Sequence, residues 1–299
     1  TGDRTDVVPT TTHLVSSVLA PKASVLIKNS TNTITNINNT NVEENNSLTD
    51  IEGANDIITL SSKNGTSSWA NRYDVVSSFG NKTSFVRIDE ALVPNKTYTS
   101  DEWVVFVNDI ITDPDYLDPY QLLGAGGAER HPHDPLVSEI IGSNTDANTL
   151  LGLHRIDITT RTGGDWNNGI PDRSRHVVID QDYNHTTNKL SARKLTVNAS
   201  RKLGITDNLL VVTNDVVLNG DIRLIDASLT GKAQLIQTHT SASLVTGAGK
   251  LLVDQNSTVP SKYRYNYIGS PVKTSAGATS YSVGGILKDG TVPTNFAGT

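Results

Sequence analysis

Three aspartates in one short loop are the side chains of this chain best suited to hold a metal ion. Asp113, Asp115 and Asp118 lie between Ile111 and Pro119, where prolines disfavour regular strand pairing. Carboxylate oxygens are the ligands that Ca²⁺ prefers, so this loop is a candidate calcium site. The glycine and the closing bidentate glutamate of an EF-hand loop are missing. The spacing therefore favours a solvated acidic turn, with calcium as the alternative.

Two histidines and an aspartate form a second group with metal-ligand chemistry. His131 and His133 flank Pro132, Asp134 follows directly, and His154 lies further along the chain. Zinc uses imidazole and carboxylate ligands, which makes the group a candidate zinc site. Alternate residues of an extended backbone point to opposite sides, and the proline limits adjustment. A surface loop is therefore the favoured interpretation.

Three tyrosines could provide a surface for sugar stacking. Tyr263, Tyr265 and Tyr267 alternate with polar residues, so in a strand all three rings would lie on one face. A glycan could stack on such a face. A half-buried strand whose rings cover a core has the same alternation, and this second interpretation is favoured.

Catalytic signatures are absent from the sequence. No serine, histidine and aspartate occur in a context that would activate a nucleophile, and without cysteine there is no thiol chemistry. We therefore expect a chain that is not an enzyme and binds no cofactor besides the candidate calcium. A glycosidase built on stacked strands could still draw carboxylates from separate coils. The residues it would use are Asp180, Asp182, Asp215, Asp221 and Asp226, for which hydrogen bonding in turns is the favoured explanation.

The elements that would position these side chains are short strands. Between Trp166 and Val253, β-branched or aliphatic runs recur at intervals of about 19 residues and are separated by turns rich in Asn, Asp and Gly. Such short runs are typical of strands. A β-solenoid explains the constant interval best, and a sandwich of short antiparallel strands is the alternative. The recurring runs are 176–179, 195–197, 216–218, 234–236 and 251–253, with 203–205, 209–212 and 222–225 in the intervals.

Composition excludes several classes of function. The formal net charge of -6 and the lack of a basic stripe argue against a nucleic-acid binder. The absence of cysteine excludes disulfides, and no apolar stretch approaches the roughly 20 residues of a membrane-spanning helix. Because the chain begins at Thr1 and lacks methionine, we expect a piece of a longer protein whose other segments are among its partners.

The first segment, residues 1–112, has the strand pattern of a known module. Strands are expected at 24–28, 56–60, 73–76, 84–88 and 102–107. The stretches LAPKASVLIKNS (19–30), ANDIITL (54–60) and YDVV (73–76) resemble successive strands of the lamin-tail domain of bacterial secreted proteins. PNKTY (94–98) and SDEW (100–103) are similar to the stretch that closes those domains. The resemblance implies an immunoglobulin-like β-sandwich, truncated at its start. The polar run 29–50 departs from the pattern.

A second resemblance covers the region that contains the repeated strands. The stretches GGDWNN (163–168), IPD (170–172), HVVID (176–180) and GDI (220–222) resemble repeated surface modules of large proteins exported by the type IX secretion system. YRYNYIGSPV (263–272) is similar to the segment that follows such modules. Those proteins are mostly adhesins, gliding-motility proteins and secreted hydrolases. The resemblance implies an extracellular, cell-surface location and a role as a stalk.

These patterns predict an all-β chain with four parts: a lamin-tail-like sandwich at 1–112, an irregular insertion or linker at 113–162, a β-solenoid or stacked short-strand module at 163–256, and the start of a further β unit at 257–299. We expect a non-catalytic structural or adhesive segment of a large secreted cell-surface protein, acting as a stalk or a partner-docking module. Its expected partners are secretion or surface-anchoring proteins and glycans. The alternatives are a secreted β-helix polysaccharide-active enzyme or its accessory domain, and the subunit of an extracellular filament.

Overall fold

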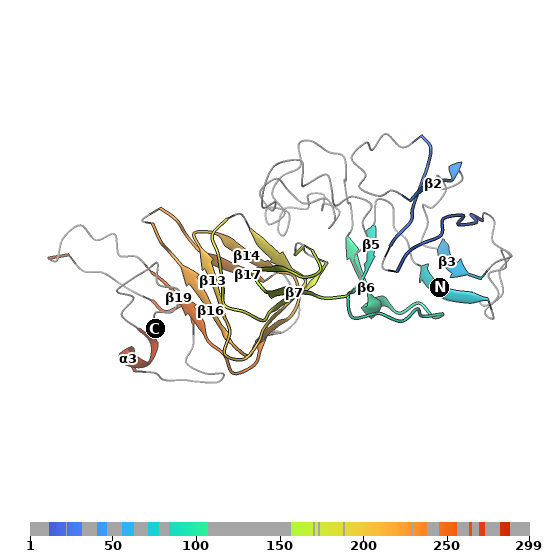
Figure 1. Cartoon of the computed structure of the whole chain (residues 1–299). Coiled ribbons are helices and arrows are strands. Elements are labelled where there is room, and N and C mark those ends of the chain that lie inside the picture. The colour runs from blue at the N-terminus through green and yellow to red at the C-terminus, as the bar shows by residue number, and fades with distance from the viewer. Residues whose placement is uncertain are drawn as a thin grey trace. The chain divides into compact units, whose positions relative to one another are not determined.

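The chain divides into two compact units, Thr1–Asp157 and Ile158–Thr299. Among the described residues, nearly all of the regular secondary structure in both units is β-strand, as the sequence predicts (Figure 1). The computed structural model describes residues 12–21, 23–31, 41–46, 56–62, 71–77, 84–106, 157–169, 171–172, 174–187, 189–228, 230–237, 245–255, 263–264, 269–272 and 282–287.

The first unit contains three pairs of strands. The parallel pair is β1 (Leu26–Lys28) with β2 (Val42–Glu44), and the two antiparallel pairs are β3 (Ile57–Ser61) with β4 (Arg72–Ser77) and β5 (Ser84–Arg87) with β6 (Trp103–Phe106). A 3₁₀ turn, η2 (Ser100–Glu102), precedes β6. All of these strands except β2 lie where the sequence predicts them, because β2 has the sequence Val-Glu-Glu within the polar run 29–50. Among the described residues the three pairs are separate sheets, so the immunoglobulin-like sandwich stays a prediction.

In the second unit successive coils of the chain stack on one another, and their strands form three sheets (Figure 1). The first sheet has the order β18-β15-β12-β9-β7-β8, the second β10-β13-β16-β19 and the third β11-β14-β17. Each coil adds one strand to each sheet in turn, which confirms the stacked arrangement of a β-solenoid and excludes the antiparallel sandwich for this unit. The strands are β7 (Thr159–Thr162), β8 (Asp165–Trp166), β9 (His176–Ile179), β10 (Tyr183–His185), β11 (Leu190–Ala192), β12 (Lys194–Val197), β13 (Lys202–Thr206), β14 (Leu209–Val212), β15 (Val216–Leu218), β16 (Asp221–Ile225), β17 (Gln234–Gln237), β18 (Val245–Thr246) and β19 (Leu251–Val253).

The stacking interval stays near the predicted value in the early coils and then lengthens. In the first sheet Leu195 pairs with Val177, 18 residues earlier, and Val216 pairs with Leu195, 21 residues earlier. The next partner, Val245, follows Val216 by 29 residues. The constant interval in the sequence predicts that β17 and β19 continue the first sheet after β15. This prediction is wrong, since β17 pairs with β14 in the third sheet and β19 with β16 in the second. Because the last coil is longer, the interval in the sequence no longer identifies equivalent strands there.

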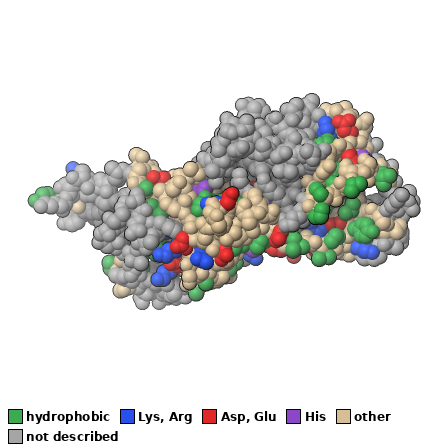
Figure 2. Space-filling model, viewed as in Figure 1, with side chains coloured by type: hydrophobic (Ala, Val, Ile, Leu, Met, Phe, Trp, Pro, Cys, Tyr) green, Lys and Arg blue, Asp and Glu red, His purple; other side chains and the backbone are tan. Residues whose placement is uncertain are grey.

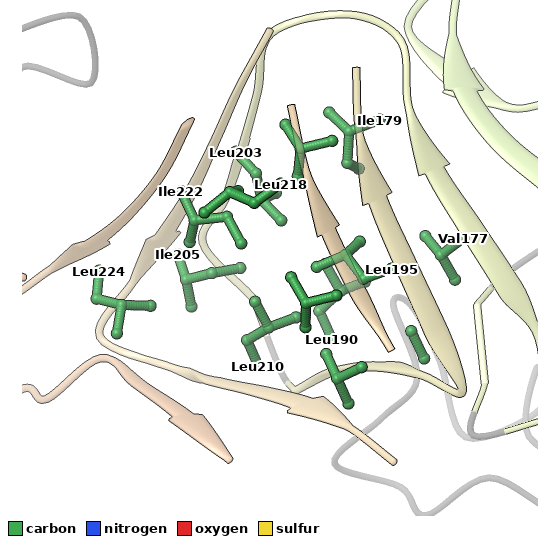
Figure 3. Packing of buried hydrophobic residues seen from close by; sticks show 14 of the residues in the cluster. Val177, Ile179, Leu190, Leu195, Leu203, Ile205, Leu210, Leu218, Ile222 and Leu224 are labelled. Atoms are coloured by element: carbon green, nitrogen blue, oxygen red, sulfur yellow. The ribbon is translucent and has the colours of Figure 1, made fainter. Parts of the chain in front are cut away.

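Apolar side chains from all three sheets meet inside the stack (Figure 3). Val177 and Leu195 come from the first sheet, Leu203 and Ile222 from the second and Leu210 from the third, and all five have zero exposure. Because alternate residues of a strand face opposite sides, each short run supplies one or two inward side chains. No single coil could bury these side chains alone, so the stability of each coil depends on its neighbours.

An antiparallel hairpin lies at the beginning of the stack. β7 pairs parallel with β9, and β8 turns back to pair antiparallel with β7. Gly163 and Gly164 form the turn with φ values of 60° and 92°, a region that glycine enters without strain. The side chain of Trp166 on β8 joins the buried cluster. The stack thus begins one strand earlier than the predicted boundary at residue 163, because β7 falls in the range assigned to the insertion.

Two glycines allow successive coils to approach closely at a turn. A Cβ on Gly249 would overlap the main-chain oxygen of Gly220 in the preceding coil. A Cβ on Gly220 would overlap the main-chain oxygens of Asn198 and Arg201 one coil earlier. The two glycines therefore follow each other in one column where no side chain fits.

The region 257–299 contributes one described element, the short helix α3 (Val283–Ile286). The further β unit expected there stays a prediction. Across the described ranges, no helix combines the length and the apolar character that a membrane crossing requires.

Candidate functional site

The candidate metal ligands of the sequence fall outside the described residues. This holds for Asp113, Asp115 and Asp118 and for the group His131, His133, Asp134 and His154. Within the part of the chain that the structure describes, no three histidine, aspartate or glutamate side chains come together in a way that could hold a metal ion. The calcium and zinc sites therefore stay predictions.

One ring of the candidate glycan-stacking face can be placed. The side chain of Tyr263 is 84% exposed, so it is accessible to a ligand. Tyr265 and Tyr267 lie outside the described residues. The common face of the three rings stays a prediction.

The aspartates of the stack bond to main-chain groups, mostly of the next coil. Asp182 Oδ1 accepts a hydrogen bond from the Lys202 N–H at 3.0 Å, and Asp221 Oδ1 accepts one from the Lys250 N–H at 2.9 Å. Asp226 Oδ1 accepts a bond from the Ala233 N–H at 2.9 Å. These bonds satisfy donors at turns, which is the role that the sequence favours for these residues.

The remaining two aspartates of that set also lie at contacts between coils. Asp180 Oδ1 accepts a hydrogen bond from Asn198 Nδ2 at 2.8 Å, and these two residues follow the paired strands β9 and β12. The main-chain oxygen of Asp215 accepts a bond from the Leu195 N–H at 2.9 Å. Polar groups at the turns therefore join each coil to its neighbour.

Acidic and basic side chains alternate along one column of the second sheet. Lys202 pairs in register with Asp221, and Asp182 and Lys250 hold the corresponding positions in the coils before and after. The order along the stack is Asp182, Lys202, Asp221 and Lys250. Opposite charges on adjacent strands favour pairing, and a slip of one residue would turn every strand over. The alternation agrees with the observed register. Charges of both signs lie interspersed on the surface in Figure 2.

A cluster of aromatic and basic side chains lies at the beginning of the stack. The rings of Trp166 and Tyr183 meet edge to face with centroids 5.8 Å apart, and the guanidinium of Arg161 lies 4.4 Å from the Tyr183 centroid. The Tyr183 hydroxyl and His185 Nδ1 are 2.8 Å apart, and His185 is fully buried. Burial raises the pKa of Tyr183, and the nearby Arg161 charge opposes this rise. The turn of this hairpin could be predicted from Gly163 and Gly164. The contact between Trp166 and Tyr183 could not, because no spacing or motif in the sequence marks these two residues as neighbours.

A single carboxylate attaches an extended segment of the first unit to β2. Glu43 Oε1 accepts hydrogen bonds from the main-chain N–H and the hydroxyl of both Ser16 and Ser17, at 2.7–3.0 Å. Glu43 Oε2 lies 2.6 Å from His13 Nε2. The Ser17 hydroxyl and then His13 are the main causes that lower the pKa of Glu43 to about 2. The sequence shows no motif that joins these distant residues.

Arg87 connects the two antiparallel pairs of the first unit. Its guanidinium forms ion pairs with Asp74 on β4 and with Glu102 in η2, the latter at 3.0 Å. It also donates a hydrogen bond to the main-chain oxygen of Val93 at 2.9 Å and lies 5.6 Å from the centroid of the Trp103 ring. Asn95 Nδ2 donates to Glu102 Oε1 at 3.0 Å, which extends the network to the preceding loop.

The bonds of these charged groups join coils to one another in the second unit and hairpins to one another in the first. Comparisons with protein-family models, with curated proteins and with solved structures find no match to this chain. The resemblances to lamin-tail domains and to type IX exported modules therefore stay expectations.

Proposed function

We propose that this chain is a non-catalytic structural and adhesive segment of a large secreted cell-surface protein, acting as a stalk or a partner-docking module. The observation that carries the proposal is the stack of coils from β9 to β19, paired in three parallel sheets around a common apolar interior. In such a stack each coil is hydrogen-bonded to the next, which makes a stiff element suited to spacing other modules apart. The location outside the cell rests on the resemblance to exported surface modules.

The bonding of the stack's aspartates supports a structural role. A glycosidase needs one carboxyl group that donates a proton and a second that acts as a nucleophile or base. Asp182 and Asp221 each accept a bond from a main-chain N–H of the following coil, and Asp180 accepts one from Asn198. Such bonds explain the presence of these carboxylates by the needs of the stack.

The location is tested by antibody labelling. Antibodies raised against residues 158–255 are applied to intact and to permeabilised cells of the source organism. We expect equal labelling of both, because the segment would face the medium. Labelling that requires permeabilisation would contradict the proposal.

The non-catalytic role is tested by incubating the chain with a panel of polysaccharides and measuring the release of reducing ends. We expect no release above that of a heat-treated sample. Release that disappears in the double variant Asp182→Asn and Asp221→Asn would overturn this part of the proposal in favour of the polysaccharide-active alternative.

A further inference from the structure

The last strand of the second sheet has an edge that no described strand covers. β19 pairs with β16 on one side and ends the order β10-β13-β16-β19. The Lys250 oxygen accepts a bond from the Ile222 N–H, and the Asp254 N–H donates to the Leu224 oxygen. Since alternate residues of a strand bond to opposite neighbours, the N–H and C=O groups of Leu251 and Val253 point towards the outer edge.

The sequence of this edge is complementary to itself in antiparallel pairing. With Leu252 at the centre, Leu251 of one copy lies opposite Val253 of a second copy and exchanges two main-chain hydrogen bonds with it. In the same register Lys250 lies opposite Asp254 of the second copy, so opposite charges meet twice. Each Asp254 carboxylate then lies between Arg223 of its own copy and Lys250 of the other. Cross-strand pairs of this kind stabilise a sheet.

The apolar residues of the last coil provide a further driving force. Leu235, Leu251 and Val253 pack against the buried cluster but are only partly buried. Leu251 and Val253 face the interior, and in an antiparallel sheet paired residues project from the same face. Pairing of two β19 strands would therefore join the two apolar interiors and remove these side chains from water.

Two strands could cover the β19 edge: a strand from residues 256–299 of the same chain, or β19 of a second copy. The alternation of Asp182, Lys202, Asp221 and Lys250 along the second sheet favours the second copy. A parallel strand that continued this alternation would have an acidic residue beside Lys250 and an apolar residue directly after it in the sequence. Between residues 256 and 299 Asp289 is the one acidic residue, and Gly290 follows it. The antiparallel partner supplies its acidic residue through Asp254.

The symmetry of the pairing limits association to two copies. A pair of antiparallel β19 strands uses the same edge of both copies, so no β19 edge is left for a third copy. The other end of the stack already has an antiparallel strand as its last member, since β8 pairs antiparallel with β7. We propose that this protein forms a closed, two-fold symmetric dimer through antiparallel pairing of its β19 strands. The proposal does not depend on the stalk function.

A single cysteine tests the geometry, because the natural chain has none. Residues directly opposite in a non-hydrogen-bonded antiparallel pair have Cα atoms about 4.5 Å apart, which lies within the range that a disulfide spans. In the full chain, Leu252→Cys should therefore form a covalent dimer under mild oxidation. Asn184→Cys is the matched control, since Asn184 is exposed and lies in the same column as Leu252, on β10. It should remain monomeric on a non-reducing gel.

Sedimentation analysis of the unmodified full chain measures the association itself. We expect twice the monomer mass at high concentration, and a dissociation constant that rises about fivefold in Lys250→Gln, which loses both symmetric ion pairs. Lys202→Gln removes a lysine from the same column inside the stack and should leave the dissociation constant unchanged. A monomer at every concentration, assemblies larger than a dimer, or equal cross-linking of the two cysteine variants would each overturn the proposal.

Discussion

Arg223 on β16 holds Asp254 by a two-point contact, with Nε and Nη2 each 3.0 Å from one carboxylate oxygen. The Arg223 side chain is 7% exposed and the Asp254 side chain 15% exposed, so the pair is largely removed from water. It joins the outer face of β16 to the residue that follows β19, and so fastens the last coil of the second sheet to the one before it.

This ion pair should be asymmetric in its response to mutation. Asp254→Ala removes the carboxylate partner of a buried guanidinium and should lower the free energy of unfolding of the second unit by about 3 kcal/mol. Arg223→Met keeps an apolar stem and leaves the more exposed carboxylate, so it should cost less, about 1 kcal/mol. Urea unfolding at a concentration where the protein is monomeric measures both. Equal losses of unfolding free energy in the two variants would contradict the expectation that an unpaired buried guanidinium costs more than an unpaired, more exposed carboxylate.

Alanine at the stacked glycines should destabilise the second unit. Gly249→Ala brings a methyl group into the main-chain oxygen of Gly220, and the coils must separate locally, at a cost of about 2 kcal/mol. Gly269→Ala is the control, since a Cβ there meets no atom of the described residues within 4 Å. Thermal unfolding of the two variants should show a lower midpoint for Gly249→Ala alone.

The attachment through Glu43 should weaken in acid. Its pKa is lowered to about 2 in the folded protein from an ordinary value of 4.5, so its contribution to stability is present above pH 4.5. The contribution is lost as the pH falls through about 2. Hydrogen exchange of residues 13–17 as a function of pH measures this loss. Glu43→Gln should remove the dependence, and Glu44→Gln, a substitution of the neighbouring exposed carboxylate, should retain it.

Truncation of a core side chain should cost more inside the stack than in its last coil. Leu210 has zero exposure and pairs in register with Leu235, which is only partly buried. Leu210→Ala should lower the free energy of unfolding by about 3 kcal/mol, and Leu235→Ala by about half as much. Both values come from urea unfolding of the monomer. A larger cost for Leu235→Ala would contradict the order of burial along the stack.

Under tension the stack should unwind in steps of one coil. Leu210 stacks on Leu190, 20 residues earlier, so release of one coil adds about 70 Å of extended chain at roughly 3.4 Å per residue. Stretching of single molecules held at both ends of the second unit measures these steps. One step that released the whole unit would show that the coils do not unfold separately.

Much of the second unit follows from the pattern of apolar runs. The runs at 176–179, 195–197 and 216–218 are strands β9, β12 and β15 of one sheet, because a constant interval of about 20 residues places equivalent side chains above one another. The pattern fails where the last coil lengthens. Beyond β15 the interval no longer identifies the sheet, and β17 and β19 belong to different sheets from the one expected.

The contacts that join distant residues could not be predicted. Glu43 and Ser17 are 26 residues apart, and Arg223 and Asp254 are 31 residues apart, with no spacing that marks either pair. Turn hydrogen bonding was predictable for Asp182 and Asp221, since both lie among the polar residues between the apolar runs. The strand that follows Asp182, β10, was not predicted, because Tyr183–His185 contains no aliphatic run. Their alternation with Lys202 and Lys250 emerges only when the true register of the second sheet is known.

The position of the β7–β8 hairpin has a consequence for biosynthesis. The hairpin is the part of the stack that is made first, and it has a sequence-local turn at Gly163 and Gly164. Each later coil can then pair with a coil that has already formed. The stack can therefore form in the direction of synthesis, before the carboxyl-terminal residues are made.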